Sequence, residues 1–164
     1  MRKFTYIPQT NGYNCGPVAV MNAYNYHQDC FRKRHVPICE TILHTCPIMG
    51  TEEKHMIKEL RDTFTVKVER GKFSKRKIDN WIERSEDHQV IILYCYSPKA
   101  YEWHYANIFR KINGRYWGAN FFTPSESGRW RFTKTIPEDY TRSFYRYQDD
   151  FVTLYIKPRE VLSE

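Results

Sequence analysis

Apolar residues in the first half of the chain recur at the three- to four-residue spacing of amphipathic helices. The segments with this spacing cover residues 18–24, 37–43, 51–62 and 74–82. The first segment directly follows a Gly-Pro step and has small alanines four positions apart, which favours close packing on one face. We therefore expect residues 18–24 to form a central, largely buried helix.

Two of the other helices have clear start signals. Thr51 precedes two acidic residues, and Ser74 precedes the apolar face of residues 78–82, so both are expected to cap a helix. In the helix that opens at Pro37, we expect Ile38, Ile42 and Leu43 to form the apolar side.

The second half of the chain has strand patterns instead. A continuous apolar run at 90–96 predicts a buried strand, and Asn113-Gly114 predicts a tight hairpin turn. The strands expected over the chain cover residues 64–69, 90–96, 105–109, 115–121, 128–132 and 151–156.

Helices followed by antiparallel strands indicate an α+β fold. We expect one domain over residues 1–164, with a helical part at about 1–88 and a sheet part at about 89–164. Neither an internal repeat nor a linker composition interrupts it.

Composition narrows the class of protein. The chain has 164 residues, 41% of them apolar, which supports a globular core without metal or disulfide staples. No apolar run is long enough to cross a bilayer, and the basic N-terminus lacks the apolar stretch of a signal peptide. Five cysteines, an odd number, favour reduced thiols and a cytoplasmic location.

The net charge of +7 favours acidic partners. An acidic peptide or protein surface is preferred over nucleic acid, because no nucleic-acid fold motif is present. The segment 140–147, which alternates basic and aromatic residues, keeps nucleic acid as the alternative.

Residues 9–17 (QTNGYNCGP) contain the candidate chemistry. They place Cys15 at the expected start of a helix, with Asn14 as a plausible N-cap, where unpaired amides and the helix dipole favour a thiolate. Gln9 lies six residues upstream and could return an amide to the same point. This pattern predicts a cysteine nucleophile with an oxyanion hole.

A cysteine nucleophile needs a base and a group that orients the base. His104 precedes a strand pattern, whereas the other histidines (27, 35, 44, 55 and 88) lie in polar or helical surface contexts. Asn120 follows sixteen residues later on the paired strand, opposite about residue 107, so a bulge or twist must bring it to His104. Asn107 and Asp149 are alternative partners.

These residues resemble those of papain-like cysteine peptidases, and most closely the double-glycine leader peptidases of bacteriocin exporters and their stand-alone peptidase-like domains. The order Gln, Cys-Gly-Pro, His and Asn is similar in residues 9–23 and 103–121. The resemblance implies that Cys15 attacks a carbonyl, His104 pairs with the thiolate and protonates the leaving amine, Asn120 orients the imidazole, and Gln9 binds the oxyanion. It also implies a helical half packed on an antiparallel sheet, and a protein or peptide substrate.

Two departures from the family pattern concern this site. Asn120-Phe121 stands where that family has aspartate and proline, although papain itself uses asparagine. Tyr101-Glu102-Trp103 is bulkier than the usual segment before the histidine, which bears on substrate preference. Residues 9–16 also resemble the nucleophile motif of proteases that deconjugate ubiquitin-like modifiers, but those place histidine and acid before the cysteine.

Other functions stay open as alternatives. An acyltransferase, a deamidase or a modifier deconjugase would use the same triad, and an inactive binding module with a basic face would not use it. A zinc site would draw on Cys30, His35, Cys39, His44 and Cys46. Their spacing fits no standard finger or ribbon, so we expect core packing there, no metal and no cofactor.

Overall fold

The computed structural model describes residues 2–71, 73–97, 102–124, 130–137 and 151–160. Its helices are α1 (Cys15–His27), a short 3-10 helix (Lys33–His35), α2 (Val36–Ile42), α3 (Glu53–Leu60) and α4 (Lys75–Arg84). Its strands are β1 (Phe64–Arg70), β2 (Gln89–Ser97), β3 (Glu102–Ile112), β4 (Arg115–Pro124), β5 (Trp130–Pro137) and β6 (Val152–Pro158). The expected α+β class is confirmed.

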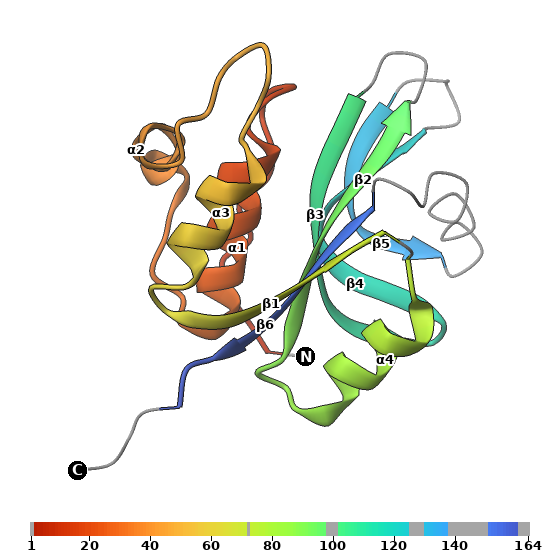
Figure 1. Ribbon diagram of the computed structural model, residues 1–164. Coiled ribbons are helices and arrows are strands. Elements are labelled where there is room, and N and C mark those ends of the chain that lie inside the picture. Colours follow the sequence, from red (N-terminus) through yellow and green to blue (C-terminus); the bar gives the residue numbers. More distant parts are fainter. Residues whose placement is uncertain (1, 72, 98–101, 125–129, 138–150, 161–164) are drawn as a thin grey trace.

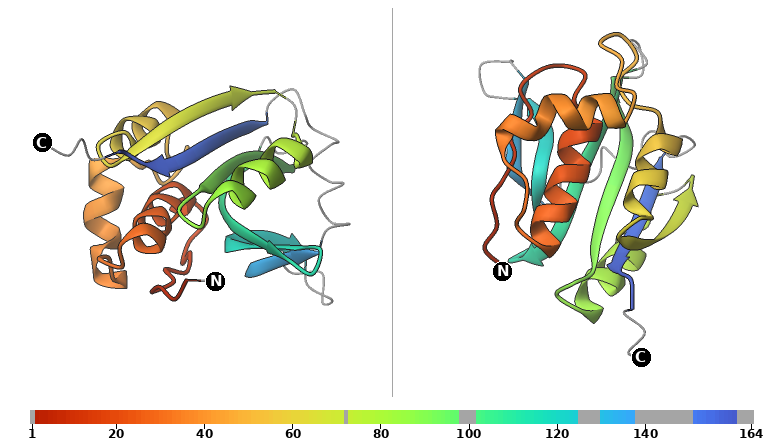
Figure 2. Two further views of the ribbon diagram at one scale, coloured as in Figure 1. Left: turned by 90° about the horizontal axis from the view of Figure 1, so that it is seen from below. Right: turned by 90° about the vertical axis from the view of Figure 1, so that its left-hand side faces the viewer.

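The strands form one antiparallel sheet in the order β1-β6-β2-β3-β4-β5. Helices α1, α2 and α3 cover one face, and α4 packs on the other (Figures 1 and 2). Strand β2 is central, and its residues alternate between the two cores: Ile91 packs beneath α1, and Val90 and Ile92 pack with α4. Burial on both faces explains its continuous apolar run.

Several local predictions are confirmed. The hairpin between β3 and β4 turns at Asn113 and Gly114, with φ angles of 51° and 72°, the left-handed values that this two-residue turn requires. The Ser74 hydroxyl caps α4 by accepting the Lys77 backbone N–H at 3.3 Å.

Two expectations about the helices are wrong. Ile38 and Ile42 are 61% and 53% exposed, because α2 packs on α1 through the neighbouring stripe formed by Cys39 and Leu43. Thr51 does not cap α3, which starts at Glu53; its buried hydroxyl instead shares a 2.7 Å hydrogen bond with Thr45.

Some expectations fall outside the described residues. These include residues 128 and 129 of the expected strand 128–132, the basic and aromatic segment 140–147, and Asp149. Within the described residues, no helix is both long enough and apolar enough to span a membrane.

Candidate active site

Cys15 occupies the first position of α1, next to two backbone N–H groups that the helix leaves unpaired. The Asn14 side chain does not cap the helix; its amide donates to Thr10 Oγ1 at 3.1 Å and approaches Glu40 Oε1 at 3.5 Å. Pro17 has no N–H to offer. The Cys15 and Gly16 amides therefore point at the Cys15 sulfur, as the Tyr105 amide of β3 also does.

Gly16 lets the start of α1 approach Thr51 closely, because a side chain at this position would not fit. A Cβ at position 16 would lie 2.6 Å from both Cβ and Oγ1 of Thr51, a distance that real side chains do not reach. The Thr51 carbonyl in turn accepts the Tyr105 hydroxyl at 3.1 Å. The start of α1 is thus wedged against Thr51 and β3.

The Cys15 thiol is buried, with 7% of the residue exposed. Burial raises its pKa, and this effect outweighs the three amides, which lower it by stabilising the thiolate. In this resting arrangement Cys15 is a neutral thiol surrounded by donors.

His104 is buried on β3, directly across from Tyr94 of β2, and the two rings meet edge to face at 5.6 Å. Its Nε2 lies 2.5 Å from the backbone carbonyl oxygen of Asn120. Since a carbonyl only accepts, Nε2 carries the hydrogen, and Nδ1 is the nitrogen that can take up a proton. Burial lowers the pKa of His104 to about 4, and the carbonyl contact offsets part of that shift.

Asn120 meets His104 through its backbone, whereas the sequence suggested its side chain. The pairing of β3 with β4 stops at Asn107 and Ala119, and Asn120 then adopts a left-handed φ of 56°. Its carbonyl oxygen meets the imidazole, while its carboxamide meets the N-terminal segment.

The Asn120 carboxamide makes three hydrogen bonds to that segment. Its Nδ2 donates to the Ile7 carbonyl at 3.1 Å, and its Oδ1 accepts the Gln9 backbone N–H at 3.0 Å and the Tyr6 hydroxyl at 2.5 Å. Gln9 is therefore held at the site by its backbone. Its own side-chain Nε2 donates to the Asn11 carbonyl at 2.8 Å, within the same loop.

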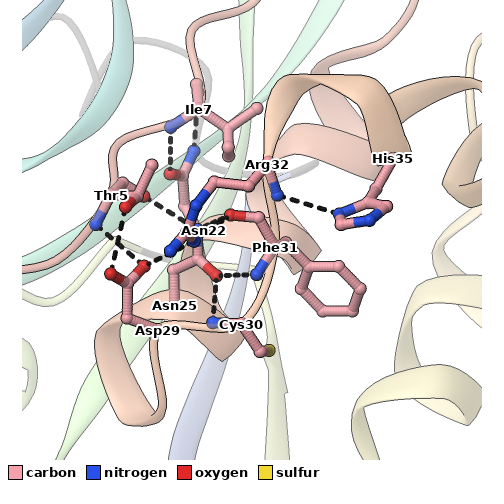
Figure 3. Close-up of polar contacts among 9 residues, drawn as sticks. All are labelled: Thr5, Ile7, Asn22, Asn25, Asp29, Cys30, Phe31, Arg32 and His35. Atoms are coloured by element: carbon pink, nitrogen blue, oxygen red, sulfur yellow. Dashed lines mark hydrogen bonds and ion pairs between the residues drawn. The ribbon is translucent and has the colours of Figure 1, made fainter.

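The N-terminal segment is also clamped from the α1 side (Figure 3). Asn22 Oδ1 accepts the Ile7 N–H at 2.8 Å, and Asn22 Nδ2 donates to the Ile7 carbonyl at 2.9 Å. Asn25 donates to the Thr5 carbonyl at 2.8 Å. The sequence analysis missed these two asparagines, although polar residues inside a buried helical pattern signal that specific partners are needed.

The predicted site residues thus assemble only in part. Gln9, Asn120 and His104 form one connected chain of hydrogen bonds. Cys15 is linked to this chain through Tyr105, next to His104 on β3, whose amide faces the sulfur.

The cysteine and histidine cluster considered for zinc is spread apart. Cys39 is buried with its sulfur 3.8 Å from the Pro17 carbonyl, Cys30 is exposed, and His35 Nδ1 accepts the Arg32 backbone N–H at 2.9 Å. Within the described part of the chain, no group of three or more His, Cys, Asp or Glu side chains gathers in a way that could hold a metal ion.

Burial of neutral His104 predicts a pH-dependent stability. Between pH 6.5 and about 4 the unfolded chain binds a proton that the folded chain excludes, so stability is full above the unfolded pKa and falls as pH drops through this window. We expect this group to remove about 3 kcal/mol from the free energy of unfolding by roughly pH 4. Urea unfolding at a series of pH values measures it. His104→Gln, which cannot titrate, should flatten the curve; an unchanged curve would contradict the assignment.

The fold is similar to that of two solved peptidase domains. One solved structure with this fold is the peptidase domain of Streptococcus ComA, a bifunctional ABC transporter involved in a quorum-sensing pathway. It aligns with a TM-score of 0.61 and 12% identity, over 96% of this chain and 100% of that one. A double-glycine motif protease from an AMS/PCAT transporter, solved with its leader peptide, aligns with a TM-score of 0.55 and 12% identity, over 96% and 93% of the two chains. No family model and no curated protein sequence matches.

Proposed function

We propose that this protein is a cysteine peptidase that hydrolyses a peptide or isopeptide bond, with Cys15 as nucleophile and His104 as base. The observation that supports this most is the placement of Cys15 in a thiol-peptidase fold. Its sulfur lies at the start of α1, faced by backbone amides, and one of these belongs to the residue next to His104. A buried structural cysteine needs no such ring of donors.

In the proposed reaction, the Cys15 sulfur bonds to the substrate carbonyl carbon while its proton passes to His104 Nδ1. The carbon–nitrogen bond then breaks, and His104 gives that proton to the leaving amine. His104 then takes a proton from a water molecule, which attacks the resulting thioester. The carbon–sulfur bond breaks, the acid product leaves, and His104 returns the proton to the Cys15 sulfur. Burial favours the neutral thiol and the neutral imidazole at rest, so the proton passes between them only once substrate is bound.

The developing oxyanion would be bound by the Cys15 backbone N–H and the Gln9 side-chain amide. Gln9 must then exchange its bond to the Asn11 carbonyl for one to the substrate. Asn120 supports both halves of this arrangement, since its carbonyl holds the imidazole and its carboxamide holds the Gln9 backbone. Losing one oxyanion donor typically costs on the order of 100-fold in rate.

The substrate we propose is a polypeptide. A peptide with a double-glycine step is the first to test, since a protein of this fold acts on that motif and was solved with a leader peptide. The net charge of +7 favours an acidic substrate surface. The odd number of cysteines, five, favours action in the cytoplasm, where thiols stay reduced, and we invoke neither a metal nor a cofactor.

Product mass tests the proposal. A peptide mixture that includes double-glycine sequences is incubated with the protein, and the products are identified by mass spectrometry. Hydrolysis gives two fragments whose summed mass exceeds the substrate by one water. Joining of a fragment to an added amine would support an acyltransferase. A mass change from glutamine to glutamate would support a deamidase. The absence of reaction with any peptide or isopeptide would support a binding module.

A further inference from the structure

A groove of about 780 Å³ lies on the outer side of α3, and no residue of the candidate active site lines it. One wall is α3 itself, and the other is formed by Arg70 at the end of β1 and Arg159 just after β6. The lining extends from Glu52, just before α3, to Asp62, just after it, so the groove follows the length of the helix. At eight residues, α3 is about 12 Å long.

The helix presents a basic stripe to this groove. Lys54, Lys58 and Arg61 stand at positions i, i+4 and i+7 of one face, and all three are exposed. Ile57 lies on the same face and is buried, which gives the groove an apolar floor between charged rims.

Most of this positive charge has no counter-ion. Arg70 forms a two-point ion pair with Glu53, and Lys54 pairs with Glu52 at 3.2 Å. Lys58, Arg61 and Arg159 also line the groove, and none of them forms an ion pair with any described residue. Asp62 is the one further acid in the described lining. The groove therefore offers unneutralised cations to an anionic partner.

Strand β1, whose last residue Arg70 lines the groove, adds a second kind of recognition. β1 is the outermost strand of the sheet, paired on one side with β6, and no described strand covers its other edge. An uncovered edge presents backbone donors and acceptors to any extended chain that approaches it. Side chains of an added strand would alternate between the α3 side and the opposite face.

We propose that the groove between α3 and the free edge of β1 binds an extended acidic polypeptide segment, which adds a strand to β1 and directs alternate carboxylates at α3. The spacing agrees with this geometry. Alternate side chains of a strand are about 6.8 Å apart, and Lys54 and Lys58 are about 6 Å apart along the helix axis. The inference is independent of catalysis by Cys15, because no residue of the candidate active site lines the groove.

The features of the groove favour a polypeptide over nucleic acid. None of the described lining residues is aromatic, so bases have no ring to stack on. A phosphate backbone also cannot continue the hydrogen-bond ladder of a strand edge, whereas a peptide can.

Binding is tested with a fluorescent octapeptide of alternating threonine and glutamate, by anisotropy, on the Cys15→Ala protein so that no cleavage intervenes. The double variant Lys58→Glu/Arg61→Glu should weaken binding by roughly 10-fold or more. The matched control Lys33→Glu/Arg34→Glu makes the same charge change on the exposed 3-10 helix and should stay within about twofold. Circular dichroism checks that both variants are folded.

Backbone methylation tests the strand pairing separately. In an antiparallel ladder, alternate residues of the added strand direct their N–H groups at the neighbour. N-methylation of one alternate set of residues should therefore abolish binding, and methylation of the other set should change it little. Equal losses in the two double variants, equal effects of the two methylated sets, or tighter groove-dependent binding of oligothymidylate would each overturn the proposal.

Discussion

Replacing Cys15 with alanine is expected to lower kcat/KM for a cleaved peptide by at least about 10⁴-fold, because no other group in the described site can form the acyl intermediate. Initial rates with the peptide identified by mass spectrometry provide the measurement. Cys30→Ala is the matched control, since Cys30 is exposed and bonds to Asn25 through its backbone N–H, which alanine keeps. It should retain activity within about twofold.

The partner variant tests whether Cys15 and His104 act together. His104→Ala should lose a comparable amount, and the double variant should be no slower than the worse of the two single variants, as in groups that act as a unit. Additive losses would show that the two residues act in separate steps. A Cys15→Ala protein that keeps a tenth of the activity would refute the nucleophile.

The resting protonation states explain why activity must be measured with substrate and not by thiol reactivity alone. Burial raises the pKa of Cys15 and lowers that of His104 to about 4, so both shifts disfavour the thiolate–imidazolium pair. The sequence suggested a preformed ion pair at Cys15. Burial of both groups favours the neutral pair in the resting protein.

Much of the fold could be predicted from local sequence signals. The hairpin depends only on its two turn residues, Asn113 and Gly114. The cap of α4 depends on Ser74 and on the backbone N–H three residues further along the chain. The apolar run of β2 marks burial on both faces without any knowledge of its neighbours. Each of these features is determined by residues close together in the chain.

The parts that could not be predicted depend on contacts between distant residues. Periodicity could not decide whether Ile38 or Cys39 faces the core, since stripes 100° apart on a short helix are both partly apolar. The role of Asn120 depends on where β3 and β4 stop pairing and on the path of the N-terminal segment. A spacing of sixteen residues relates Asn120 to His104 without revealing which atom makes the contact.

Asn120 is the residue whose replacement should most affect stability and activity together. Asn120→Ala removes all three carboxamide hydrogen bonds and leaves the buried Gln9 N–H without its acceptor, and it forces alanine into a left-handed φ. We expect a loss of about 3 kcal/mol in the free energy of unfolding. Urea denaturation measures it, and a loss under about 1 kcal/mol would contradict the assigned bonds.

Asn120→Asp distinguishes the backbone contact with His104 from a side-chain contact. If the carboxamide holds Ile7 and Gln9, aspartate keeps the acceptor but sets a buried carboxylate against the Ile7 carbonyl. The variant should then be least stable at high pH and recover as pH falls, because the protonated acid can donate to that carbonyl. If the side chain instead orients His104, aspartate should stabilise the imidazolium and raise activity near neutral pH. Asn113→Asp, at the exposed hairpin turn with a similar φ of 51°, is the control and should change neither property.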